Sequence, residues 1–167
     1  LTSTGAGSPP AFETISAGYT LATPQTATAG NTFGSIPSGT ISILVMIQNY
    51  DPDSGSDILI QIGDAGGIET SGYVAGAGSA GWTNISKTTG FVLKQKQSDD
   101  NINGMYHLTL LNASTFTWVG SGSATVNGSD CTSGGGGKSL SAELTQVKVM
   151  GHSGDAPDSG TINIAYL

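Results

Sequence analysis

The chain has 167 residues, and only 10% of them are charged, against roughly 25% in an ordinary soluble domain. Five lysines, twelve acidic residues and no arginine give a net charge of −7. This balance excludes a nucleic-acid partner, because phosphate backbones are bound by clustered Lys and Arg. No apolar run reaches the roughly 18 residues of a membrane-spanning helix, so we expect no membrane insertion.

The remaining composition indicates a β-rich protein with small surface side chains. Gly, Ser, Thr, Ala and Asn take the place of the missing charged residues, which is typical of extracellular, viral or fibrous β-proteins. Cys131 is the single cysteine, which excludes an intrachain disulfide and a cysteine-based metal cluster. One domain of this length can bury roughly 70% of its unfolded surface, so a sizeable core is expected.

The first segment, residues 1–12, reads LTSTGAGSPPAF. Its two consecutive prolines disfavour a helix and favour an extended conformation, so we expect a connector there and a head domain over residues 13–167. The segment has neither an initiating Met nor the basic n-region of a secretory signal peptide. We therefore expect the sequence to begin inside a longer chain or after a processing step.

The strongest strand pattern is TISILVMIQNY at residues 40–50. A continuous β-branched and apolar run of this length predicts a strand covered on both faces. The alternating run DILIQIG at residues 57–63 follows a short turn and predicts a hairpin with it. The turn at residues 51–57 is rich in Asp and Ser, and we interpret it as self-capping, with an incidental cation site as the alternative. An EF-hand is excluded because Ile62 stands where the bidentate acid would be needed.

The second half predicts further strands. Residues 105–111 and 115–119 read as two strands joined by a short turn, and residues 124–126 as another. The glycines at residues 134–137 are interpreted as a flexible connector. Residues 139–150 predict a strand with a bulge near Thr145, and residues 161–167 predict a closing strand with apolar residues at alternate positions. The fold class predicted is all-β: a jelly-roll-like antiparallel β-sandwich of about eight or nine short strands, without substantial helix.

No pattern in the sequence predicts catalysis, a cofactor or a metal. The histidines, His107 and His152, lie far apart, and His107 is interpreted as a satisfied core or subunit-interface residue. The acid pair Asp99 and Asp100 lies in a polar loop, and nothing in the sequence sets the carboxylate separation that a glycosidase needs. We therefore expect no enzyme activity.

Aromatic side chains in loops are the best candidates for ligand contact, since their faces stack on the C–H faces of sugars. The glycine-rich loop at residues 66–84 and the polar loop at residues 95–103 are the expected contact regions. Trp118, in a strand with Phe116, is interpreted as core. The candidate receptor or glycan contacts are Tyr73, Trp82, Asn84, Asp99 and Asp100.

Four segments resemble a known family. The stretch IQIGDAGGIETSGY at residues 60–73 is similar to a recurring segment in the C-terminal regions of bacteriophage tail-fibre proteins, notably of marine and cyanobacterial phages. GKSLSAEL at residues 137–144 and DSGTINI at residues 158–164 resemble the final strands of those proteins. Residues 1–12 resemble the fibre segment before the C-terminal head. The family usually has Phe or a similar residue before Asp-x-Gly, where this chain has Ala156 and Pro157.

The resemblance implies a structural virion protein, the distal head of a homotrimeric phage fibre, located on the extracellular particle. Its partners would be its sister chains, other virion proteins and a host surface glycan or receptor, most simply a polysaccharide. A capsid decoration or head-fibre protein that stabilises the shell is the alternative. A secreted carbohydrate-binding module or glycan-active enzyme is the third hypothesis.

Overall fold

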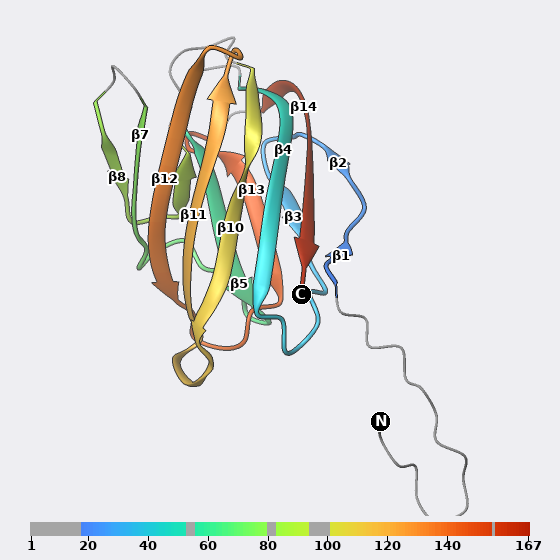
Figure 1. Ribbon diagram of the computed structural model, residues 1–167. Helices are drawn as coiled ribbons and strands as arrows, with labels where there is room; N and C mark the ends of the chain where they lie inside the picture. The colour runs from blue at the N-terminus through green and yellow to red at the C-terminus, as the bar shows by residue number, and fades with distance from the viewer. Residues whose placement is uncertain (1–17, 53–55, 80–82, 94–100, 155) are drawn as a thin grey trace, which may run out of the picture.

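The computed structural model describes residues 18–52, 56–79, 83–93, 101–154 and 156–167. Over these residues the chain forms two antiparallel β-sheets that pack face to face (Figure 1). The prediction of an all-β sandwich is therefore confirmed. The expected connector at residues 1–12 lies outside the described residues.

The larger sheet has nine strands in the order β1-β14-β4-β10-β11-β12-β7-β8, with β2 also paired to β14. The smaller sheet has the order β3-β13-β5-β6, with β9 also paired to β5. The strands are β1 (Thr20–Leu21), β2 (Gln25–Thr26), β3 (Asn31–Phe33), β4 (Ser42–Pro52), β5 (Ile58–Asp64), β6 (Gly67–Ile68), β7 (Val74–Ser79), β8 (Ile85–Lys87), β9 (Phe91–Leu93), β10 (Ile102–Asn112), β11 (Thr117–Val126), β12 (Asp130–Ser139), β13 (Gln146–Gly151) and β14 (Pro157–Tyr166).

The described residues thus contain fourteen strands, more than the eight or nine expected. Six of the strands, β1, β2, β3, β6, β8 and β9, have only two or three residues, too few for a hydrophobic alternation to reveal them. The chain passes repeatedly from one sheet to the other, whereas β10, β11 and β12 follow one another in a meander within the larger sheet. A single 3₁₀ turn, η1 (Ala113–Thr115), joins β10 to β11.

The predicted hairpin between the strands at residues 40–50 and 57–63 is wrong. β4 pairs with β10 and β14 in the larger sheet, whereas β5 pairs with β13, β9 and β6 in the smaller one. All seven residues of β5 are buried. Ile58, Ile60 and Ile62 join the main core, while Leu59 on the opposite face packs in a second cluster. A strand that is apolar on both faces needs cover on both sides, which the crossover provides.

The glycine run at residues 134–137 is not a connector, because it lies in the middle of β12. Here glycine permits close approach between strands. A Cβ on Gly136 would lie 2.6 Å from the Val74 carbonyl oxygen, and a Cβ on Gly122 of β11 would lie 2.5 Å from Tyr106 Cδ2. Side chains at these positions would force neighbouring strands of the larger sheet apart.

The segment predicted as one bulged strand at residues 139–150 is divided by the structure. Only its second part is β13, and residues 140–145 cross from the larger sheet to the smaller one. Leu140 and Leu144 are both buried, so the crossover closes one end of the core. The change of phase near Thr145 therefore marks a change of sheet.

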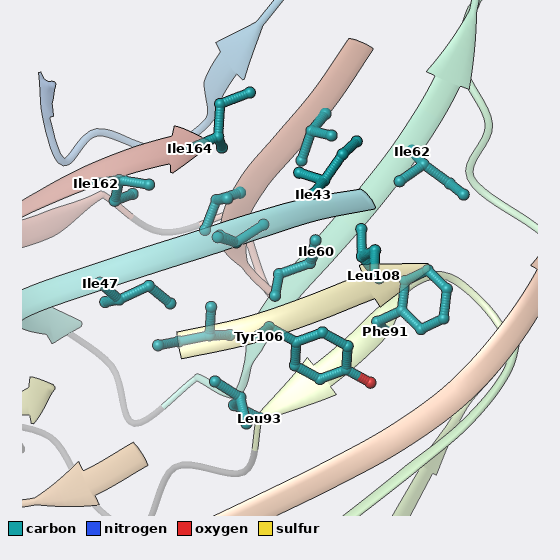
Figure 2. Packing of buried hydrophobic residues seen from close by; sticks show 14 of the residues in the cluster. Ile43, Ile47, Ile60, Ile62, Phe91, Leu93, Tyr106, Leu108, Ile162 and Ile164 are labelled. Carbon is teal, nitrogen blue, oxygen red and sulfur yellow. The ribbon is translucent and has the colours of Figure 1, made fainter. Parts of the chain in front are cut away.

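The core is formed by side chains that alternate along the long strands (Figure 2). Ile43 and Ile47 of β4, with Ile162 and Ile164 of β14, project into it from the larger sheet. The closing strand predicted at residues 161–167 is confirmed as the last part of β14, paired with β4 on one side and with β1 and β2 on the other. Its apolar residues Ile162 and Ile164 therefore face their own core.

Replacing Gly122 with alanine is predicted to destabilise the domain by about 1–3 kcal/mol, the usual cost of overpacking a core. The new Cβ would meet the Tyr106 ring and the Met105 carbonyl oxygen, each 2.5 Å away. The free energy of unfolding in urea measures the effect.

Gly137→Ala is the matched control on the neighbouring strand, since its Cβ would come no closer than 3.6 Å to any atom. This variant is expected to stay within about 0.5 kcal/mol of the original protein. Equal losses in the two variants would contradict the close-approach explanation.

Candidate functional site

The outer face of the larger sheet has an unusually bare region over β7, β12 and β11. Ala75 and Ala77 of β7 are buried, so the alternation turns Gly76 and Gly78 outwards. The cross-strand register continues this pattern, placing Gly135 beside Gly76 and beside Ser121. No long side chain stands on these rows of β7 and β12, which leaves the backbone of the sheet accessible from outside.

Two open hollows, of about 460 Å³ and 370 Å³, lie on this region. Both are lined by Ser133 and Gly134 of β12, so the two hollows adjoin each other, and we call them together the trough. The trough is lined by Gly76, Ala77, Gly78, Asn84, Ile85, Met105, His107, Ser121, Gly122, Ser123, Ser133, Gly134 and Gly135.

The trough offers hydroxyl and amide groups without a charged side chain. Ser121, Ser123 and Ser133 are exposed and can each donate and accept a hydrogen bond. Asn84, exposed beside β8, adds a side-chain amide at one end. Met105 is 51% exposed and supplies an apolar contact at the other end. Such a surface suits a neutral ligand that carries many hydroxyl groups.

His107 lies at the rim of the trough on the outer face of β10, so it is not a core residue, and its place at a subunit interface stays a prediction. Its Nε2 is 2.6 Å from Ser42 Oγ, and the Tyr19 hydroxyl lies 2.7 Å from the same oxygen. Ser42 is only 7% exposed and is therefore a poor nucleophile for an external substrate. The three side chains attach the segment before β1 to the face of the sheet.

A second polar cluster closes one end of the sandwich, and we call it the clamp: Asp64, Glu69, Tyr73, Lys138 and Ser141. Lys138 Nζ forms an ion pair with Glu69 and lies 5.5 Å from the centre of the Tyr73 ring. Ser141 donates from its backbone N–H to Glu69 Oε1 (2.7 Å), and its hydroxyl lies 2.6 Å from Asp64 Oδ2. The clamp joins the turn after β5 to the end of β12.

The clamp keeps its carboxylates ionised. Hydrogen bonds from the Ser141 hydroxyl and from the Gly66 N–H hold the pKa of Asp64 below its usual value. Burial alone would raise the pKa of Glu69, but the hydrogen bonds from Lys138 and Ser141 outweigh it and leave that pKa lowered. The Lys138 side chain is buried, so its ammonium group depends on this partner.

Tyr73 belongs to the clamp and to the core, which corrects its prediction as a glycan contact. It is only 1% exposed, and its ring packs edge-to-face on Phe91 at a centroid distance of 5.3 Å. Its hydroxyl accepts a hydrogen bond from the Ile62 N–H (2.8 Å) and donates to the Glu69 carbonyl oxygen (2.9 Å). An aromatic ring inside a glycine-rich loop can thus be the buried anchor of that loop.

The other predicted contacts have different outcomes. Asn84 lines the trough and is the one described candidate on an open surface. Trp82, Asp99 and Asp100 lie outside the described residues. Sequence reasoning missed Ser121, Ser123 and Ser133, although the alternation of Gly and Ser along residues 120–123 could have indicated a strand with a bare face.

The described residues contain no group of three or more His, Cys, Asp or Glu side chains placed to hold a metal ion. In the turn considered as a cation site, Asp57 lies 3.5 Å from the Lys87 ammonium, and residues 53–55 fall outside the described ranges. Nor does the described part of the chain have a helix long and apolar enough to cross a membrane.

No protein-family model matches the chain, and comparisons with the curated proteins and with the solved structures also gave no match.

Glu69→Gln is predicted to destabilise the domain by about 1–3 kcal/mol at pH 7, because it leaves the buried Lys138 ammonium without its charged partner. This loss of stability should become smaller at acidic pH. In the unfolded chain the glutamate titrates near its ordinary value of 4.5, above its lowered pKa in the folded protein. The contribution of Glu69 is therefore complete above pH 4.5 and disappears as the pH falls through the folded value.

Urea unfolding at pH 7 and pH 3 measures both effects. Asp158→Asn, which neutralises an exposed carboxylate, is the control and should change the stability little at either pH. A Glu69→Gln deficit that is equally large at pH 3 would contradict the ionic role of the clamp.

Proposed function

We infer that this chain is the head domain of a virion fibre and binds a host surface polysaccharide in the trough. The observation that carries this proposal is the pair of adjoining hollows across β7, β12, β11 and β10, which has no Asp, Glu, Lys or Arg in its lining and presents three serine hydroxyls and an exposed amide. An open trough accepts a long polymer along its length, whereas a closed pocket would admit only a chain end. No catalytic step is part of the proposal.

Several features favour a neutral glycan over other polymers. The chain carries a net charge of −7, so a polyanion would be repelled at long range. An apolar peptide would leave the hydroxyl groups of Ser121, Ser123 and Ser133 without partners. Sugar hydroxyls can bond to these groups while the C–H faces of the sugar contact Met105, which also lines the trough.

The clamp supports the placement of the domain in a virion fibre. Asp64, Glu69 and Tyr73 lie in the first segment that resembles tail-fibre proteins, and Lys138 and Ser141 lie in the second. Since the two segments contact each other through these polar groups, their joint occurrence in one chain has a physical reason. The two segments joined by the clamp would then form one structural unit of the fibre head.

The proposed fibre is a homotrimer, and three troughs on one particle would strengthen a weak single contact through multivalency. The low charge and small side chains of the chain also suit close packing of three copies around one axis. Multi-angle light scattering of the purified domain is predicted to give three times the chain mass of 16.7 kDa. A monomer at micromolar concentration would contradict the trimer.

Ser133→Phe is predicted to weaken polysaccharide binding at least about tenfold, because the ring would fill the point shared by the two hollows. The variant should fold normally, since Ser133 is exposed and Phe is favourable in a strand. Binding is measured on an array of bacterial surface polysaccharides, with circular dichroism to confirm the fold.

Ser153→Phe is the matched control: it adds the same ring at an exposed turn after β13 that does not line the trough. Its binding should equal that of the original domain. Unchanged binding in Ser133→Phe, or no binding of the original domain to any polysaccharide on the array, would contradict the proposal.

A further inference from the structure

A smaller hollow of about 170 Å³ lies at one end of the sandwich, where the η1 turn approaches the segments before β4 and β13. It shares no lining residue with the trough. Most of its wall is apolar and comes from Ile41, Leu110, Phe116 and Leu144. We call it the end pocket.

Trp118 also lines the end pocket and carries an unused hydrogen-bond donor. The residue is only 1% exposed, and its indole N–H is buried without an acceptor among the described residues. A buried donor without a partner is unfavourable, and most such groups in folded proteins are satisfied. A ligand that brings an acceptor oxygen to this N–H would recover the lost hydrogen bond.

Glu143 is the charged group in the wall of the end pocket. Its carboxylate accepts hydrogen bonds from the Gly39 N–H (2.7 Å) and the Ser38 hydroxyl (2.9 Å). These bonds hold the pKa of Glu143 below its usual value, so it is ionised at neutral pH. An ionised carboxylate repels anionic ligands and can only accept hydrogen bonds. The ligand should therefore not be an anion, and an N–H donor in addition to its acceptor would suit Glu143.

An acetamido group meets all three requirements of the wall. Its methyl group suits the apolar side chains, its carbonyl oxygen can accept from the Trp118 indole, and its N–H can donate to Glu143. We propose that the end pocket binds the acetamido group of an N-acetylated amino sugar. This inference rests on the proposed glycan-binding function and specifies the class of sugar recognised at a second site.

The test follows the indole N–H of Trp118 by ¹H–¹⁵N NMR during titration of the full chain with methyl N-acetyl-β-D-glucosaminide. The chain has two tryptophans, Trp82 and Trp118, so a Trp82→Phe variant assigns the resonance. We expect a saturable downfield shift of the indole proton. Methyl β-D-glucoside, which lacks the acetamido group, should bind at least about tenfold more weakly, the worth of about one hydrogen bond.

A pair of neighbouring variants tests the location. Ala113→Leu fills the end pocket from an exposed position and should weaken the titration at least about tenfold. Ser114→Leu adds the same side chain at the next exposed residue, which does not line the pocket, and should leave the titration unchanged.

The outcomes separate this inference from the proposed function. No indole shift, an equal shift with the plain glucoside, or equal binding by Ala113→Leu would each overturn the end pocket as an acetamido site. If polysaccharide shifts the NMR signals of Ser133 and Asn84 while the amino sugar does not shift the indole signal, the trough is supported as a binding site and the end pocket is contradicted. If the amino sugar shifts the indole signal while no polysaccharide shifts the signals of the trough residues, the end pocket is supported as a binding site and the trough is contradicted.

Discussion

The architecture depends on the close approach that glycine permits along β11 and β12. Gly120 and Gly122 face the core of the sandwich and leave room for the side chains of Tyr106 and Leu108 on the neighbouring strand. Gly134 and Gly136 do the same for the backbone of β9 and β7, because a Cβ on either would meet a carbonyl oxygen of Val92 or Val74. Large inner side chains on β10 are thus packed against the parts of β11 and β12 whose inward positions are glycine, which gives a dense core without a large residue at every inward position.

The scarcity of large side chains in the middle of β11 and β12 also shapes the outer surface of the larger sheet. On β11 and β12 the outward positions between the glycines carry serine or glycine, so the face that does not build the core stays open as the trough. The clamp then fixes the end of β12, since Lys138 and Ser141 hold the turn after β5 through Glu69 and Asp64. One pair of strands therefore connects the core, the clamp and the proposed binding surface.

The continuous apolar run of β4 and the hydrophobic alternation along β10 and β14 were enough to predict the all-β class and to locate these strands. Hydrophobic patterning failed for β12, because glycine carries no information about which face is buried. It also paired β4 with β5, since adjacency in sequence favours a hairpin and only the burial of both faces of β5 reveals the crossover. The candidate site was harder to predict from the sequence than the fold class. Asn84 lies on the open surface, and its role as a ligand contact stays a prediction, whereas Tyr73 is buried. The serines of the trough come together only through the register of β11 with β12, which places Ser123 opposite Ser133.

The central claim is that the bare face of β7, β12 and β11 is the surface that binds glycan. Amide chemical-shift mapping of the ¹⁵N-labelled domain, with a polysaccharide that it binds on the array, tests this most directly. The account predicts that the perturbed amides cluster on the trough, around Gly78, Ser121 and Ser133. Perturbations confined to the smaller sheet, around β3 and β13, would contradict it.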